Sequence, residues 1–262
     1  MPDAGFNLGS YQKFIRFERK EVTEILIAGL VMGFIVSFAR WGEGNTADLA
    51  VGFANLLLGV VMSLFILVVF SFASKVAAVK KGYLARFKIS YGMVIASLVV
   101  AFLSYGAVWF FPVGGISMET ERRLRIGMFR YQFNLKEQSI ISFFGPLAVL
   151  HAALLIKTIA ILTNFAFIPK LLLLDYLKMS VLFSILIMLP LPSLNGLHIF
   201  FDRPGKYFMF FGNILGTAVA LFYIDNIFLS ILVSLIFAGL FLFIGTKLMD
   251  SLNKVEAPAK KN

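Results

Sequence analysis

The chain contains no cysteine and only two histidines among its 262 residues. Without cysteine it can form neither disulfides nor thiolate metal sites, so the redox compartment cannot be inferred from the sequence. Charged residues are also scarce: they make up 15% of the chain and hydrophobic residues 60%, against about 25% and 45 to 50% in soluble domains. This balance is typical of an integral membrane protein.

Apolar runs of about 20 residues, the length that crosses the hydrocarbon core of a bilayer, occur repeatedly along the chain. Because lipid offers no hydrogen-bond partners, each run is expected to be helical. They form one predicted membrane domain, residues 22–248, between cytoplasmic tails at 1–21 and 249–262. The fold class expected is an all-α polytopic helix bundle. The runs are residues 22–39, 49–73, 91–111, 140–163, 171–192, 207–224 and 227–248.

The positions of the basic residues predict how these runs cross the membrane. If residues 91–111 enter and return on the same side, six spans remain and both termini are cytoplasmic. Of the 24 Lys and Arg residues, only Arg40, Lys157, Lys170 and Lys178 then lie outside, as the positive-inside rule requires. Seven true spans remain the alternative, although they divide the cations evenly. The net charge of +10 does not indicate nucleic acid as a partner, because the basic residues lie between the apolar runs. The prediction is a multi-pass protein of the cell membrane.

Several short segments carry recognisable patterns in a fixed order. The second run ends in Phe70-Ser71-Phe72-Ala73-Ser74-Lys75, and the fourth contains Gly145-Pro146 near its start. A strand-like segment, Phe111-Pro112-Val113-Gly114-Gly115-Ile116, lies between them, and Pro190-Leu191-Pro192-Ser193-Leu194-Asn195-Gly196 follows the fifth run. Together these segments resemble the site-2 protease family, the zinc-dependent intramembrane proteases. The resemblance implies the fold of that family over most of the chain.

The resemblance also implies that the chemistry of the family is missing. In the family, two His at i and i+4 and an Asp bind zinc, and a Glu acts as general base. The matching positions here are Phe70 and Ser74 for the two His, Asn195 for the Asp and Ser71 for the Glu. No catalytic residue, metal site or cofactor is therefore expected. The retained backbone positions are candidates for a groove that holds a client: Gly114, Gly115, Gly145, Pro146, Pro190, Pro192 and Gly196.

The function implied is binding without cutting. The partners expected are the lipid bilayer and a transmembrane or membrane-proximal client, or the other subunits of a membrane complex. An extended segment such as residues 111–117 can bind a client strand by main-chain hydrogen bonds.

Two other functions remain open from the sequence. His151 and His198 could form an unconventional metal site, which would make the chain an active intramembrane metalloprotease. Lys157 lies well inside a run, where a charge is a functional candidate, so a small transporter or channel is the other alternative. A simpler interpretation is that Lys157 reaches the outer interface. Asp175 and Lys178, at i and i+3, are expected to pair.

Overall fold

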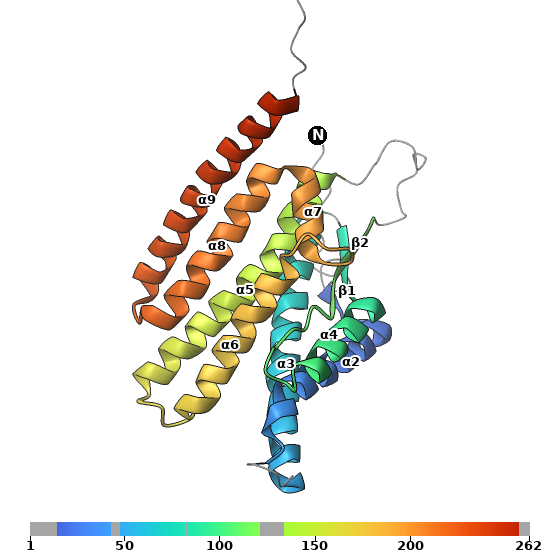
Figure 1. Ribbon diagram of the computed structural model, residues 1–262, viewed down its shortest axis with the longest axis vertical. Coiled ribbons are helices and arrows are strands. Elements are labelled where there is room, and N and C mark those ends of the chain that lie inside the picture. The colour runs from blue at the N-terminus through green and yellow to red at the C-terminus, as the bar shows by residue number, and fades with distance from the viewer. Residues whose placement is uncertain (1–14, 43–47, 82, 121–133, 257–262) are drawn as a thin grey trace, which may run out of the picture.

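The computed structural model describes residues 15–42, 48–81, 83–120 and 134–256 (Figure 1). Most of the predicted N-terminal tail, the end of the C-terminal tail and the basic segment 121–130 lie outside these residues. The described chain is mostly helical, as predicted. Its elements are α2 (Arg19–Ser37), η1 (Phe38–Arg40), α3 (Leu49–Val79), β1 (Tyr83–Ile89), α4 (Tyr91–Leu103), β2 (Gly114–Thr120), α5 (Leu135–Leu162), α6 (Lys170–Ile187), α7 (Asn195–Asp202), α8 (Pro204–Tyr223) and α9 (Ile227–Glu256).

Five segments of helix are long and apolar enough to cross a membrane. The surfaces of α3 and α9 expose large apolar side chains, including Leu57 at 66% and Leu235 at 59%, and such surfaces are suited to lipid. The chain thus has the helices of an integral multi-pass membrane protein. The remaining predicted span, residues 171–192, corresponds to α6, which has 18 residues and carries three charged side chains. The five segments are Arg19–Arg40, Leu49–Val79, Leu135–Leu162, Pro204–Tyr223 and Ile227–Met249.

The run at 91–111 does not form one long helix. Helix α4 covers only 13 residues, and the chain then turns at Tyr105 and Gly106, which both have positive φ. After the turn it returns in an extended conformation to β2. The backbone N–H of Ser90 donates to the carbonyl of Val113 at 2.9 Å, so the two ends of this segment lie next to each other.

Strands β1 and β2 form an antiparallel pair in which Phe87 lies opposite Ile116. Strand β1 is a departure from the all-α prediction. Its outer edge is covered by α2, because the N–H of Phe87 donates to Glu21 Oε1 at 3.0 Å and that of Ile89 to Glu24 Oε2 at 2.8 Å. The outer edge of β2 faces the start of α7.

Helices α5, α6, α8 and α9 form the larger part of the bundle, and α9 lies at its margin against α8 (Figure 1). Lys157 of α5 is almost fully buried. Its ammonium donates to the carbonyls of Leu221 and Ile224, both at 2.9 Å, and pairs with Asp225 at 2.8 Å. The C-terminus of a helix favours a cation, so Lys157 caps α8. This role was not predicted.

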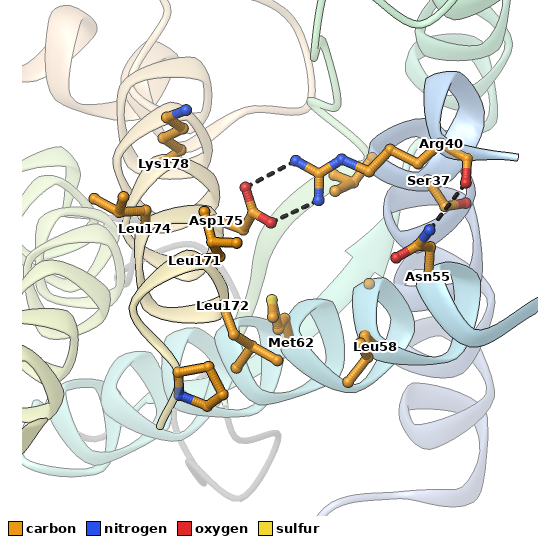
Figure 2. A pocket seen from close by; sticks show the side chains of 13 residues that line it. Ser37, Arg40, Asn55, Leu58, Met62, Leu171, Leu172, Leu174, Asp175 and Lys178 are labelled. Carbon is orange, nitrogen blue, oxygen red and sulfur yellow. Dashed lines mark hydrogen bonds and ion pairs between the residues drawn. The ribbon is translucent and has the colours of Figure 1, made fainter. Parts of the chain in front are cut away.

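The predicted pair between Asp175 and Lys178 is wrong. Asp175 instead binds Arg40, which follows α2, through two hydrogen bonds of 2.5 and 2.8 Å (Figure 2). A bidentate guanidinium–carboxylate pair is stronger than a pair with a single ammonium contact. This ion pair joins η1 to α6.

Candidate functional site

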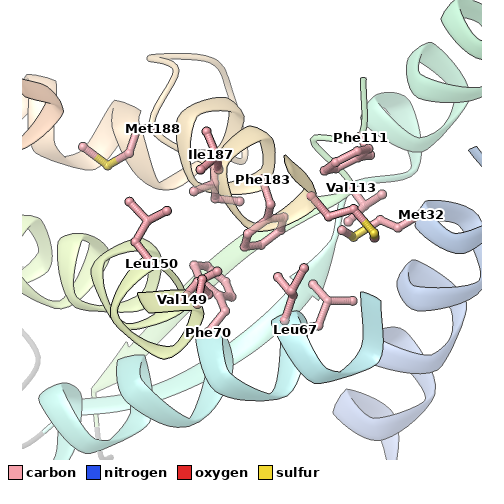
Figure 3. Packing of buried hydrophobic residues seen from close by; sticks show 14 of the residues in the cluster. Met32, Leu67, Phe70, Phe111, Val113, Val149, Leu150, Phe183, Ile187 and Met188 are labelled. Atoms are coloured by element: carbon pink, nitrogen blue, oxygen red, sulfur yellow. The ribbon is translucent and has the colours of Figure 1, made fainter. Parts of the chain in front are cut away.

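The predicted positions on α3 meet α5 at a close crossing. Phe70 and Ser74 lie one turn apart and are fully buried. A Cβ atom added to Gly145 would lie 2.5 Å from Ser74 Oγ and 2.6 Å from the ring of Phe70. Glycine is therefore required for this approach of the two helices. The Phe70 ring also packs edge to face on Phe183, with 5.2 Å between the centroids (Figure 3). An aromatic side chain therefore occupies the position where the resembled family has its first His ligand.

Pro146 shapes the next part of the site. Proline has no N–H, so it leaves the carbonyl four residues earlier in its helix, that of Ser142, without the usual partner. The side chain of Asn195 supplies one: its Nδ2 donates to this carbonyl at 2.8 Å. The carbonyl of Pro146 itself accepts a hydrogen bond from Ser184 Oγ at 3.2 Å, which ties α6 to the same turn.

Asn195 also holds β2. Its Oδ1 accepts from the N–H of Ile116 at 2.9 Å, and the residue is fully buried. The two partners fix the orientation of the amide, because an N–H needs the oxygen and a carbonyl needs the nitrogen. A Cβ on Gly115 would clash with the carbonyl of Ser193 and lie 3.0 Å from Asn195 Oδ1. Asn195 therefore binds α5 and β2 together.

The turn between α6 and α7 brings Asn195 to this position. It contains Pro190 and Pro192, and Ser193 adopts a positive φ of 69°. A Cβ on Gly196 would clash with the carbonyl of Met188, so glycine allows α7 to start directly against the end of α6. The glycines and prolines singled out in the sequence thus serve the backbone geometry of this turn, of β2 and of the α3–α5 crossing.

The structure brings the predicted positions together at one stretch of α5. Phe70 and Ser74 approach Gly145, and Asn195 binds Ser142, which lies three residues, or about 4.5 Å of helix, away. The hydroxyls of Ser71, Ser74 and Ser142 are buried and have no hydrogen-bond partner among the described residues. The contact between α3 and α5 thus contains serine hydroxyls and the ring of Phe70. These positions supply neither a general base nor a strong zinc ligand.

A buried ion pair lies one turn beyond Ser71. Lys75 and Glu21 are each 2% exposed, and their charged atoms are 2.7 Å apart. Lys75 also donates to the carbonyl of Arg16 at 3.2 Å and lies 4.8 Å from the centroid of the Phe17 ring. Glu21 holds β1 as well, through Phe87. The pair joins α2, α3 and the sheet beside the site.

A cavity of about 280 Å³ opens along β2. Residues of both strands line it, among them Ile89 of β1 and Met118 of β2, together with Gln138 and His198. Burial lowers the pKa of His198 below its ordinary value, which favours the neutral imidazole, with one donor and one acceptor. Gln138, which the sequence did not single out, is 9% exposed.

The two histidines have separate surroundings. His151 Nδ1 lies 2.8 Å from the carbonyl of Leu147 within α5, whereas His198 lines the cavity beside β2. Within the part of the chain that the structure describes, no three His, Asp or Glu side chains gather as a metal site would need.

Comparisons with protein-family models, curated proteins and solved structures give no match for this chain.

Proposed function

We propose that this chain is a catalytically inactive relative of the site-2 proteases, which binds a transmembrane or membrane-proximal client or acts as a subunit of a membrane complex. The resemblance assigns the ligand positions to Phe70, Ser74 and Asn195. The convergence of these three residues on the Ser142–Gly145 stretch of α5 is the observation that carries the proposal. Each position holds a side chain that is a poor zinc ligand or none, so binding replaces cutting.

The edge of β2 is the proposed binding surface. Glu21 and Glu24 already occupy the edge of β1. On β2 the N–H of Ile116 points away from β1, to Asn195. Every second residue of an antiparallel strand points its N–H to the same edge, so the N–H of Met118 points away from β1 as well. No described residue bonds to this N–H of Met118. It lies at the cavity of Gln138 and His198, where a client strand can pair with it.

The proposed topology has six spans and cytoplasmic termini, in the cell membrane. The bond between Ser90 and Val113 supports a segment that enters and returns, and the resulting positive-inside distribution of Lys and Arg supports the orientation. Helix α6 is the sixth span. Its Asp175 is neutralised by Arg40, which lowers the cost of placing a carboxylate near the membrane.

Replacing Met118 with Pro should abolish client binding, whereas Met118→Ala should preserve it. Proline removes the N–H on the open edge, which a client strand needs. The sheet should survive, because Met118 and Ala85 are paired at a position where the strands exchange no hydrogen bonds. The measurement is the yield of a covalent adduct from a photo-crosslinking residue at Ser117 in native membranes.

The two Met118 variants form a matched pair for this experiment, and both should unfold at the same temperature in detergent. An adduct that appears in Met118→Ala and is lost in Met118→Pro supports strand addition at β2. Equal adduct yields in the two folded variants would contradict the proposed binding surface.

A further inference from the structure

A cavity of about 490 Å³ lies at the opposite end of α3 and α6 from the site. It opens between three elements, the end of α2 with η1, the N-terminal half of α3 and the first turns of α6 (Figure 2). This volume is within the range of pockets that bind small molecules. Nothing in the proposed client binding uses it.

One wall of the cavity is charged. Arg40 and Asp175 neutralise each other, and the Arg40 guanidinium lies 5.5 Å from the centroid of the Trp109 ring. Lys178 follows Asp175 by three residues on α6, is exposed, and pairs with no described residue. The lining side chains therefore carry a net charge of +1. An unpaired cation at the membrane is costly unless it meets water or an anion.

The other wall is apolar. Leu58 and Met62 come from α3, and Leu171 and Leu172 come from α6. Helices α3 and α6 have few contacts with each other, so this wall is open between them. A ligand that fits both walls has an anionic head and a hydrocarbon chain.

We propose that this cavity binds a phospholipid whose headgroup is negatively charged. The phosphodiester lies between the Lys178 ammonium and the guanidinium N–H groups of Arg40 that Asp175 leaves free. A guanidinium has five N–H donors, and Asp175 accepts two hydrogen bonds from it. The upper part of an acyl chain packs along Leu58 and Leu172. A zwitterionic lipid would leave the net positive charge uncompensated, and free phosphate would leave the apolar wall bare.

The protein contains only two tryptophans, and both adjoin Arg40, which lines the cavity. Trp109 stacks under Arg40, and Trp41 follows Arg40 and packs on Phe53 with 5.6 Å between ring centroids. Intrinsic fluorescence therefore reports on the proposed site, and a lipid with brominated acyl chains should quench it on binding.

The experiment titrates detergent-solubilised protein with dibrominated phosphatidylglycerol or dibrominated phosphatidylcholine. Half-maximal quenching should need about fivefold less of the anionic lipid, the effect expected of one lysine near anionic lipid. Lys178→Gln should remove this preference and Lys178→Arg should keep it. Lys170→Gln is the matched control, because it removes the same charge from α6 at a residue that does not line the cavity, and it should keep the preference too.

Equal quenching by the two lipids in the unmodified protein would overturn the proposal. So would a preference that persists in Lys178→Gln, or one that is lost as much in Lys170→Gln, since both would point to general surface charge. Inorganic phosphate should leave lipid binding unchanged. Displacement of the lipid by millimolar phosphate would show a phosphate site and contradict a lipid site.

Discussion

Replacing Lys75 with Met should lower the free energy of unfolding by about 3 to 5 kcal/mol, the usual cost of removing one partner of a buried ion pair. Both Lys75 and Glu21 are almost completely buried, so the carboxylate left behind has no access to water. The loss should be seen in chemical or thermal unfolding of the detergent-solubilised protein. Because Glu21 also holds β1 through Phe87, the sheet beside the site should loosen with it.

Two further variants separate the ion pair from the packing of the lysine stem. Glu21→Gln keeps an acceptor for the N–H of Phe87, so Lys75→Met combined with Glu21→Gln should recover most of the lost stability. Lys80→Met removes an exposed lysine from the end of the same helix and should change stability by no more than about 0.5 kcal/mol. If Lys75→Met is no worse than Lys80→Met, the buried pair does not stabilise this protein.

Asn195→Asp should destabilise the protein by about 3 kcal/mol at neutral pH. The carboxylate can still accept from Ile116, but it cannot donate to the carbonyl of Ser142, which Pro146 leaves without a helix partner. Burial beside a carbonyl raises the pKa of such an aspartate above the value of about 3.9 that it has in the unfolded chain. Its protonated form can donate, so the variant should resemble the unmodified protein below about pH 4 and lose stability as the pH rises.

Asn226→Asp is the control for this substitution. Asn226 caps α9 and uses only its oxygen, which accepts from the N–H groups of Phe228 and Leu229, and Asp is as good as Asn at such a position. It should therefore be nearly neutral at pH 7. A stable Asn195→Asp variant over the whole pH range would mean that the bond to Ser142 contributes little.

The role of Asn195 also bears on the restoration of zinc binding. Phe70→His and Ser74→His would put two imidazoles on one face of α3. The third ligand would need Asn195→Asp, and this change removes the hydrogen bond that Asn195 donates to the carbonyl of Ser142. Asn195, at the position where the resembled family has its Asp ligand, thus serves the packing of this chain.

The helices could be predicted from the sequence for a physical reason, whereas the common site of Phe70, Ser74 and Asn195 was expected only from the family resemblance. Long apolar runs have few alternatives to a membrane helix, and the glycines and prolines at 145, 146, 190, 192 and 196 mark places where helices approach closely or end. Pro146 even identifies Ser142, four residues earlier, as a carbonyl in need of a partner.

Contacts between distant elements could not be predicted in the same way. The pairs Arg40–Asp175 and Lys75–Glu21 depend on how helices are placed against one another, which a single sequence does not specify. The local rule for i and i+3 favoured Lys178 as the partner of Asp175, and the guanidinium of Arg40 was the better partner. Strand β1 was missed because it directly follows a long helix, although Ala85, Phe87 and Ile89 alternate in burial as a strand's buried face does.

The metal content of the purified protein tests most directly the claim that binding has replaced cutting. With Phe70, Ser74 and Asn195 at the resembled ligand positions, we predict well under one zinc per chain and an unfolding temperature that chelators do not change. A stoichiometric zinc that disappears in His151→Ala or His198→Ala would contradict the claim and identify the chain as a metalloprotein with a site of its own.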